Sequence, residues 1–271
     1  MKNFAQRTSY DALIRGIRRK RKILAVFMVT ALLVTLILAS PTYIGLPENP
    51  LINYGGMNPV IAVLIVFALL IIGFILAVVI SMPLTASLDE ECDPQKYLAL
   101  NTALGNRNTL CHVYAKGCFY AGDFSGALRY ATEMIASEKE DQQKVGLFYK
   151  ARCEFLLGDF DSLRRTAGLY ENALLHTKRE KKNKNLYENL QTILLLLCAL
   201  ADGDLQKIEM YRKQATAWNR SKATEGYLHY IKGVAAHRVG DEKESIYHFM
   251  AVKENCGKTV FSKLADEFLA G

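Results

Sequence analysis

The amino-acid sequence predicts an all-α protein in which two transmembrane helices are followed by an α-solenoid of antiparallel helix pairs. Three observations support this fold class. Two long stretches near the N-terminus contain no charged residue, the chain has no proline after Pro94, and a short Gly-Asp motif occurs four times in the second half. The apolar stretches predict membrane crossings, whereas the other two features predict paired helices without interruption.

The two apolar stretches are residues 23–40 and 60–80. Each is long enough to cross a bilayer as a helix, which takes about 17 to 25 residues. We therefore predict a transmembrane hairpin over residues 23–82. A cleaved signal peptide is the rival interpretation of the first stretch, but the apolar part of a signal peptide usually has only about 7 to 15 residues.

The charge distribution predicts the orientation of this hairpin. The formal net charge of the protein is +7, and residues 1–22 alone account for it, with eight bases and one acid. Basic flanks remain in the cytoplasm. We therefore predict a cell-membrane protein, bacterial because no organellar presequence is visible, with both termini cytoplasmic. The basic cluster can act only as this topology signal or can also bind anionic lipid headgroups; it consists of Arg18, Arg19, Lys20, Arg21 and Lys22.

No feature of the sequence indicates catalysis, a cofactor or a nucleic-acid interface. Phosphate loops, nucleophile elbows and paired-cysteine zinc patterns are absent from the sequence, and the excess basic charge abuts an apolar segment instead of spreading over a folded face. Cys111, His112 and Cys118 are the one group that suggests a metal, but they lack a fourth ligand at suitable spacing. The six cysteines are scattered, so we interpret them as small buried side chains in a reducing compartment.

Residues 93–271 are predicted to form a cytosolic helical domain with an internal repeat. The Gly-Asp pairs begin at Gly122, Gly158, Gly203 and Gly240, so that the glycines are 36, 45 and 37 residues apart. Glycine can adopt the left-handed conformation that ends one helix, and the following aspartate can cap the next. A helix pair that returns about every 34 residues is typical of a helical solenoid.

These repeats resemble the tetratricopeptide (TPR) family over residues 93–271. In that family small residues lie seven positions before the turn glycine and five positions after it. Here the earlier position holds Ala115, Ala151, Leu196 and Gly233, and the later one holds Ala127, Leu163, Ile208 and Ser245. Two departures are the missing proline at the repeat ends and an insert at residues 178–185, whose basic run indicates either a solvated loop or a site for an acidic partner.

The resemblance implies a protein or peptide partner in a concave groove lined by the first helix of each pair. Aromatic and basic side chains mixed in such a groove suit an acidic or aromatic peptide, although packing between repeats is the other interpretation of each residue. The predicted groove residues are His112, Lys116, Phe119, Phe148, Arg152, Tyr227, Tyr230, His237 and Arg238.

We therefore expect a membrane-anchored TPR-like adaptor or scaffold that is not an enzyme and that holds a protein partner at the cytosolic face. The alternative is an accessory subunit of a membrane transport or assembly complex, in which the hairpin makes the main contacts. A degenerate enzyme is a third reading.

Overall fold

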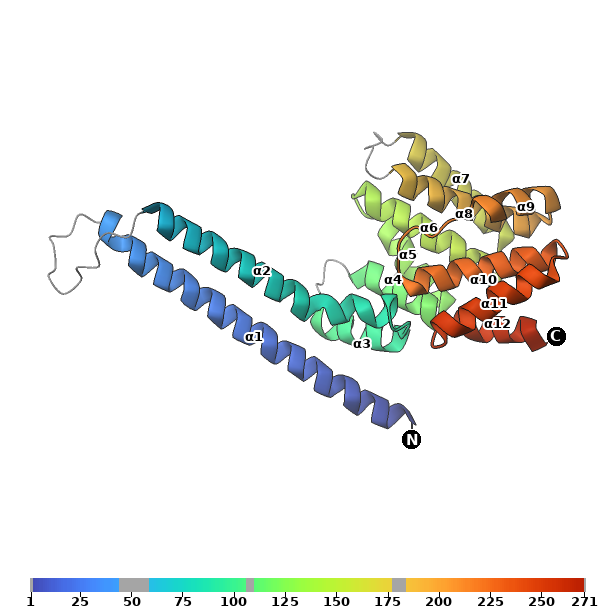
Figure 1. Ribbon diagram of the computed structural model, residues 1–271. Coiled ribbons are helices and arrows are strands. Elements are labelled where there is room, and N and C mark those ends of the chain that lie inside the picture. Colours follow the sequence, from blue (N-terminus) through green and yellow to red (C-terminus); the bar gives the residue numbers. More distant parts are fainter. Residues whose placement is uncertain (1, 44–58, 106–109, 177–183, 271) are drawn as a thin grey trace. The chain divides into compact units, whose positions relative to one another are not determined.

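The computed structural model describes residues 2–43, 59–105, 110–176 and 184–270 (Figure 1). The described residues form twelve α-helices and no strand, which confirms the all-α class. The chain divides into two compact units, Met1–Pro83 and Leu84–Gly271, and each is described by itself. The charged insert at residues 178–185 and the segment between the two apolar stretches lie largely outside the described residues.

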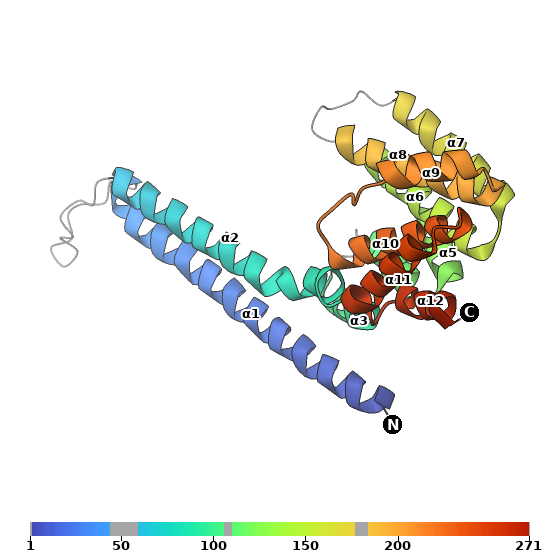
Figure 2. The same ribbon diagram turned by 45° about the vertical axis from the view of Figure 1, so that its right-hand side comes forward.

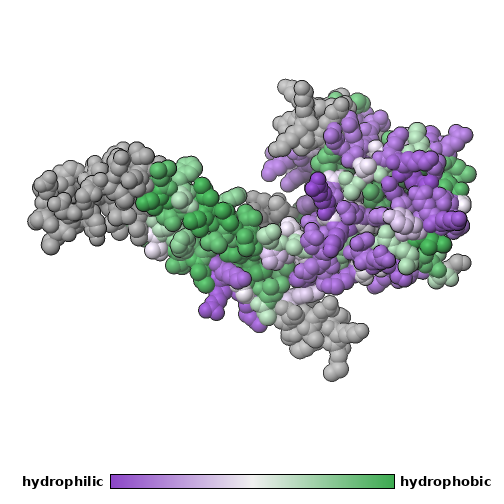
Figure 3. All heavy atoms as spheres, in the orientation of Figure 1, coloured by the Kyte–Doolittle hydropathy of each residue, from purple (hydrophilic) through white to green (hydrophobic). Residues whose placement is uncertain are grey.

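Unit 1 consists of two helices that run side by side in opposite directions (Figures 1 and 2). Helix α1 (Lys2–Tyr43) contains both the basic segment and the first apolar stretch, and α2 (Pro59–Asp89) contains the second. The helices approach closely at Gly73, because a Cβ there would overlap the sulfur of Met28. Figure 3 shows hydrophobic side chains over the described part of this pair, whereas the visible face of unit 2 is mostly hydrophilic.

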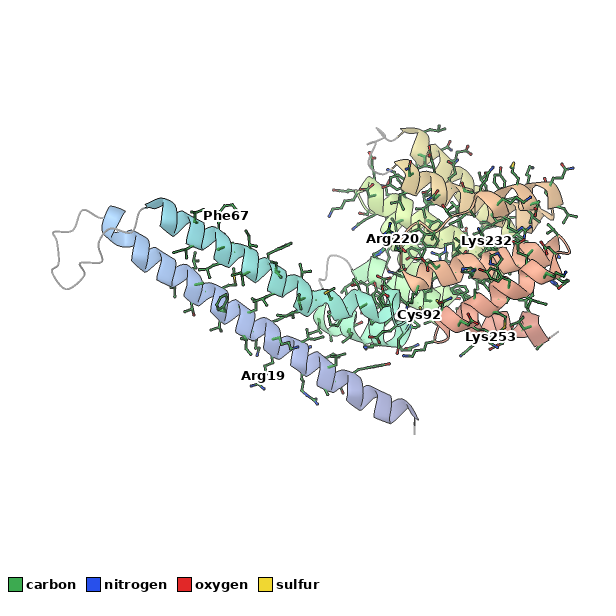
Figure 4. The ribbon with its side chains drawn as sticks, viewed as in Figure 1. Arg19, Phe67, Cys92, Arg220, Lys232 and Lys253 are labelled. Carbon is green, nitrogen blue, oxygen red and sulfur yellow. The ribbon has the colours of Figure 1, made fainter. Side chains whose placement is uncertain are left out.

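Among the residues that the structure describes, one helix is long and apolar enough to cross a membrane, by length and composition, over Leu64–Asp89. Its side chains are largely exposed, including Phe67, labelled in Figure 4, and Phe74, at 63% and 71%. Apolar side chains in water would be unfavourable, and hydrocarbon is the environment that suits them. The crossing predicted over residues 23–40 is not confirmed and stays a prediction.

Unit 2 is a series of antiparallel helices in which each packs against the next. The first of them begins at Pro94 and ends at Leu104, and Asp93 caps its first turn by accepting a hydrogen bond from the amide of Lys96. The helices are α3 (Pro94–Leu104), α4 (Leu110–Ala121), α5 (Phe124–Ile135), α6 (Glu140–Leu157), α7 (Phe160–His176), α8 (Lys184–Asp202), α9 (Leu205–Gln214), α10 (Lys222–Arg238), α11 (Glu242–Cys256) and α12 (Val260–Ala270).

The four Gly-Asp turns join α4 to α5, α6 to α7, α8 to α9 and α10 to α11. All four glycines have positive φ angles, between 70° and 90°, as predicted. Each following aspartate accepts a hydrogen bond from the amide three residues later, at 2.9 to 3.2 Å. The eight positions compared with the TPR pattern are all buried. The structure therefore supports a helical repeat architecture built from paired helices.

The inner helices of unit 2 close on themselves. The first helix of each pair packs on the next at two places, α4 on α6 and α6 on α8. At the end of the chain α12 packs on α10 and also on α4, the first of the inner helices. In an open solenoid each repeat touches only its neighbours. Here the contact between α4 and α12 joins the two ends of the series, so the inner face is enclosed.

Two turn glycines differ in their surroundings, so substitutions at them can test the packing of the last helix. Gly158 and Gly122 both have left-handed backbone angles, but a Cβ at Gly158 would meet nothing within 4 Å, whereas one at Gly122 would lie 2.8 Å from Val260 Cγ2. We expect Gly158→Ala to lower the free energy of unfolding by about 1 kcal/mol through backbone strain, and Gly122→Ala to lower it further because α12 must move.

The measurement is urea unfolding of the full chain in detergent micelles, followed by the fluorescence of Trp218, the single tryptophan. Equal losses in the two variants would contradict a tight contact between this turn and α12.

Candidate functional site: an arginine enclosed by aromatic rings

The centre of unit 2 contains a charged side chain. Arg152 lies on α6 and is 0% exposed. The helical spacing of residues 148, 149 and 152 places their side chains on one side of α6, because positions three and four apart are neighbours. That side faces the other inner helices. An arginine at such a position is unusual, since charged residues are almost never fully buried unless they are paired.

Aromatic rings surround the guanidinium of Arg152. Its central carbon lies 3.8 Å from the ring centroids of both Phe119 on α4 and Tyr227 on α10. Trp218, in the linker between α9 and α10, lies at 5.0 Å. All are within the range of about 6 Å in which a cation is attracted to a ring face. We call the whole set the central aromatic cluster: Phe119, Tyr120, Phe148, Tyr149, Trp218, Tyr227, Tyr230 and Phe261.

Ring contacts within the central aromatic cluster hold the inner helices together. Phe261 of α12 lies 5.3 Å from Phe119 of α4 and 5.1 Å from Tyr227 of α10, measured between ring centroids. Trp218 meets Phe148 of α6 edge-on at 5.2 Å. Such pairs contribute about 0.5–1.5 kcal/mol each beyond the area they bury. The cluster is therefore the structural reason that α12 returns to α4.

The guanidinium makes no hydrogen bond of normal geometry among the described residues, although the phenols of Tyr120 and Tyr227 lie close enough to interact with it. All three nitrogens of Arg152 lack a partner among the described residues, as do the hydroxyls of Tyr120 and Tyr227. Burial alone would lower the pKa of Arg152, but the phenols of Tyr227 and Tyr120 raise it above its usual value. Burial raises the pKa of Tyr227 to about 12. At neutral pH the site thus contains a cation among neutral rings.

An enclosed charge of this kind is costly. The effective penalty for burying an ion is several kcal/mol, and a desolvated cation–ring contact returns about 2 kcal/mol. An acceptor that bonded to the guanidinium would stabilise the buried charge further, since hydrogen bonds to charged groups contribute about 1.5–3 kcal/mol. An anionic oxygen that reached the guanidinium would therefore be stabilised there, and a carboxylate matches the planar guanidinium in two parallel hydrogen bonds.

The predicted groove residues fall into two groups. Phe119, Phe148, Arg152, Tyr227 and Tyr230 converge in the central aromatic cluster, and each is at most 6% exposed. The resemblance placed these side chains on a common inner face, and they do share one, but that face is filled by the side chains themselves. Among the described residues, these five side chains are thus covered and not open to solvent.

The other four predicted residues lie apart from the cluster's centre. His112 is half-buried, and burial lowers its pKa to about 4. Lys116 forms an ion pair with Asp89 at 2.7 Å. His237 and Arg238 are exposed at the end of α10, where the Nδ1 of His237 lies 3.3 Å from a carboxylate oxygen of Glu242. Of the four, His112 contacts the central aromatic cluster, since its ring centroid lies 6.0 Å from that of Tyr149.

The predicted lipid-headgroup residues lie on α1 in unit 1. Arg18, Arg19, Lys20 and Lys22 are exposed, and Figure 4 labels Arg19. Arg21 is half-buried and donates a hydrogen bond from Nη2 to the Oγ of Ser81, at 3.4 Å. This contact places the basic cluster level with the end of the second apolar stretch.

Sequence reasoning missed several members of the site. Trp218 lies in a linker without periodicity, and Tyr120, Tyr149 and Phe261 were not assigned to the inner face. The one available signal was that Trp218 is the only tryptophan and stands between two helices. Among the described residues, no three His, Cys, Asp or Glu side chains gather closely enough to bind a metal ion. Cys111 instead contacts Glu133, at 3.3 Å.

Comparisons of this chain with models of protein families, with curated proteins and with solved structures found no match.

The balance of charge burial and ring contacts at Arg152 can be measured. We expect the free energy of unfolding of Arg152→Met to equal that of the wild type or to exceed it by up to about 2 kcal/mol, because a hydrophobic side chain of similar volume removes an unpaired buried charge. Arg152→Lys should be destabilised, since a compact ammonium keeps the charge and loses the planar contact with the rings.

Urea unfolding of the full chain in micelles, monitored by circular dichroism, compares the three proteins. A loss of more than about 2 kcal/mol in Arg152→Met would show that the contacts between cation and rings outweigh the burial cost.

Proposed function

We propose that this protein is a membrane-anchored helical-repeat scaffold, in which the α1–α2 hairpin fixes the chain in the cell membrane and unit 2 holds an acidic segment of a protein partner at the cytosolic face. The observation that carries the proposal is the buried guanidinium of Arg152 on the inner face of the repeats, whose nitrogens make no hydrogen bond of normal geometry among the described residues. A buried unpaired donor of this kind calls for an explanation, and a carboxylate supplied by a partner gives one.

The membrane part of the proposal needs α1 as a second crossing. Several side chains along α1, among them Ile23, Val26 and Leu32, are 56–66% exposed. The bond between Arg21 and Ser81 and the close approach of Met28 to Gly73 align the two apolar stretches antiparallel. The basic cluster then lies at the same depth as residue 81. Because basic flanks stay inside, both termini are cytoplasmic in this proposal.

The partner's route to Arg152 passes the linker at residues 215–221. Its two ends, Ala215 and Ser221, are buried, while Trp218 between them is only half-buried. Arg220, labelled in Figure 4, is exposed two residues after Trp218 in the linker. Lys222, the first residue of α10, is another exposed base. These two cations would attract an acidic segment to the linker. Trp218 is the ring that must then move away from Arg152.

The finer assignment to the TPR family also belongs to this proposal. The four left-handed glycines, the capping aspartates and the eight buried contact positions support it. The enclosed inner face is a departure from the open groove that the resemblance implies. In our proposal this filled face opens at the linker when Trp218 moves.

The proposal predicts a fluorescence response. A peptide with several aspartates and glutamates, added to the full chain in micelles, should shift the emission of Trp218 to longer wavelength and change its intensity, because the indole leaves the aromatic cluster for water. A peptide with the corresponding amides, asparagine and glutamine, should produce no such change. The change should saturate with peptide concentration and weaken with added salt.

Arg152→Met is the matched variant, because it keeps Trp218 and its ring contacts but lacks the cation. It should lose at least tenfold in peptide affinity. An unchanged affinity in Arg152→Met would place acidic binding elsewhere and contradict the proposed site.

The proposed topology can be tested separately with cysteines placed at Ser9 and Tyr54. In intact cells a membrane-impermeant maleimide should label Tyr54→Cys and leave Ser9→Cys unlabelled until the membrane is broken. With α2 as the only crossing, positions 9 and 54 would lie on the same side and label alike. A cysteine in place of Gly271 serves as the control and should behave as Ser9→Cys does.

A further inference from the structure

Two cysteines that are 164 residues apart in the chain meet in unit 2. Cys92 lies in the short turn between α2 and α3, labelled in Figure 4, and Cys256 is the last residue of α11. Their sulfur atoms are 3.1 Å apart. Both side chains are buried, at 2% and 1% exposure. A disulfide has an S–S bond of about 2.05 Å, so an approach of about 1 Å would join them.

The surrounding residues hold the two thiols against each other. Gly226 of α10 leaves room for Cys256, because a Cβ at Gly226 would overlap the sulfur. A second link lies beside the first, where the Nζ of Lys258 pairs with Asp93 at 3.3 Å. The turn after α2 and the end of α11 are thus joined by two contacts, Cys92 with Cys256 and Asp93 with Lys258. The approach of the sulfurs is built into the packing of the turn after α2 against the end of α11.

The two thiols are also unlike in their electrostatics. The hydrogen bond between the two sulfurs lowers the pKa of Cys92, and the nearby Lys222 lowers it further. The same hydrogen bond, together with burial, raises the pKa of Cys256. The Cys92 thiol therefore ionises more readily than the Cys256 thiol. Since the thiolate is the nucleophile in sulfur exchange, Cys92 is the attacking group and Cys256 the second thiol to react.

We propose that Cys92 and Cys256 are a reversible disulfide pair that is formed by exchange with a small disulfide and that fastens the closed form of unit 2. The Cys92 thiolate attacks one sulfur of the small disulfide and expels the other as a thiolate, which leaves a mixed disulfide on Cys92. Cys256 then loses its proton to solvent and attacks the sulfur of Cys92, which expels the second small thiol. In sum, two protein thiols are oxidised and one small disulfide is reduced to two thiols.

This bond would join the turn after α2 to the end of α11, and so the first and last parts of unit 2. The loop that it closes contains most of the repeat helices, and a cross-link over a long loop restricts the unfolded chain most strongly. In the reducing cytoplasm the pair stays as thiols, and a rise in small disulfides would close it. The inference does not depend on what the central aromatic cluster binds.

The test uses the full chain in lipid nanodiscs, exposed to glutathione buffers from fully reduced to fully oxidised, and in parallel to hydroxyethyl disulfide as a smaller oxidant. After acid quenching, free thiols are alkylated and the protein is analysed by mass spectrometry. We expect two of the six thiols to escape alkylation, and a peptide map to show the link between Cys92 and Cys256. Oxidation should also raise the urea midpoint.

Cys256→Ser should abolish the link and the midpoint shift and should leave a mixed disulfide on Cys92. Cys153→Ser, at another buried thiol, should keep both. If all six thiols stay alkylatable with either oxidant, or if the link joins other cysteines, the proposal is wrong.

Discussion

The structure of unit 2 depends on the aromatic rings that meet around Arg152. Those rings come from α4, α6, α10 and the linker before α10, and Phe261 of α12 packs on two of them. No single helix could provide this surrounding. The closure of the inner helices and the burial of the charge are therefore one event: the cation is tolerable only when several ring faces reach it, and the rings reach it only when α12 returns to α4.

The sequence predicted the local parts of this arrangement well, for a physical reason. A left-handed glycine and an aspartate that accepts from the amide three residues later are features of four consecutive residues, so their signal survives without any knowledge of the fold. The same register also placed Phe119, Phe148 and Arg152 on a common inner side. Closure could not be predicted in this way, because residues 119 and 261 are far apart in the chain and no periodicity connects them. The open groove was expected from a resemblance, and the side chains themselves fill it.

The cysteines show the same limit. From spacing alone the six thiols read as unrelated small buried side chains, since no two stand close together in sequence. What brings Cys92 and Cys256 together is the return of the chain's last helices to the turn after α2, with Gly226 supplying the space. The bond between Lys258 and Asp93 beside them is long-range as well. The sulfur pair, the ion pair and the ring contacts all form between segments that are far apart in the chain. All three therefore depend on the closure of unit 2.

A closed inner face does not prevent binding, if opening it costs less than the ligand returns. When Trp218 moves, it loses its edge-on contacts with Phe148 and Tyr227 and its contact with Arg152. At about 0.5–1.5 kcal/mol for each ring pair and about 1–2 for the cation, the cost is about 2–5 kcal/mol. A carboxylate that forms two hydrogen bonds with the guanidinium, at about 1.5–3 kcal/mol each, returns about 3–6 kcal/mol. The two sums are close, so binding would be weak for a lone carboxylate and would depend on further acidic residues near Arg220. Residence at the membrane surface then matters, because it raises the local concentration of a partner held in the same bilayer.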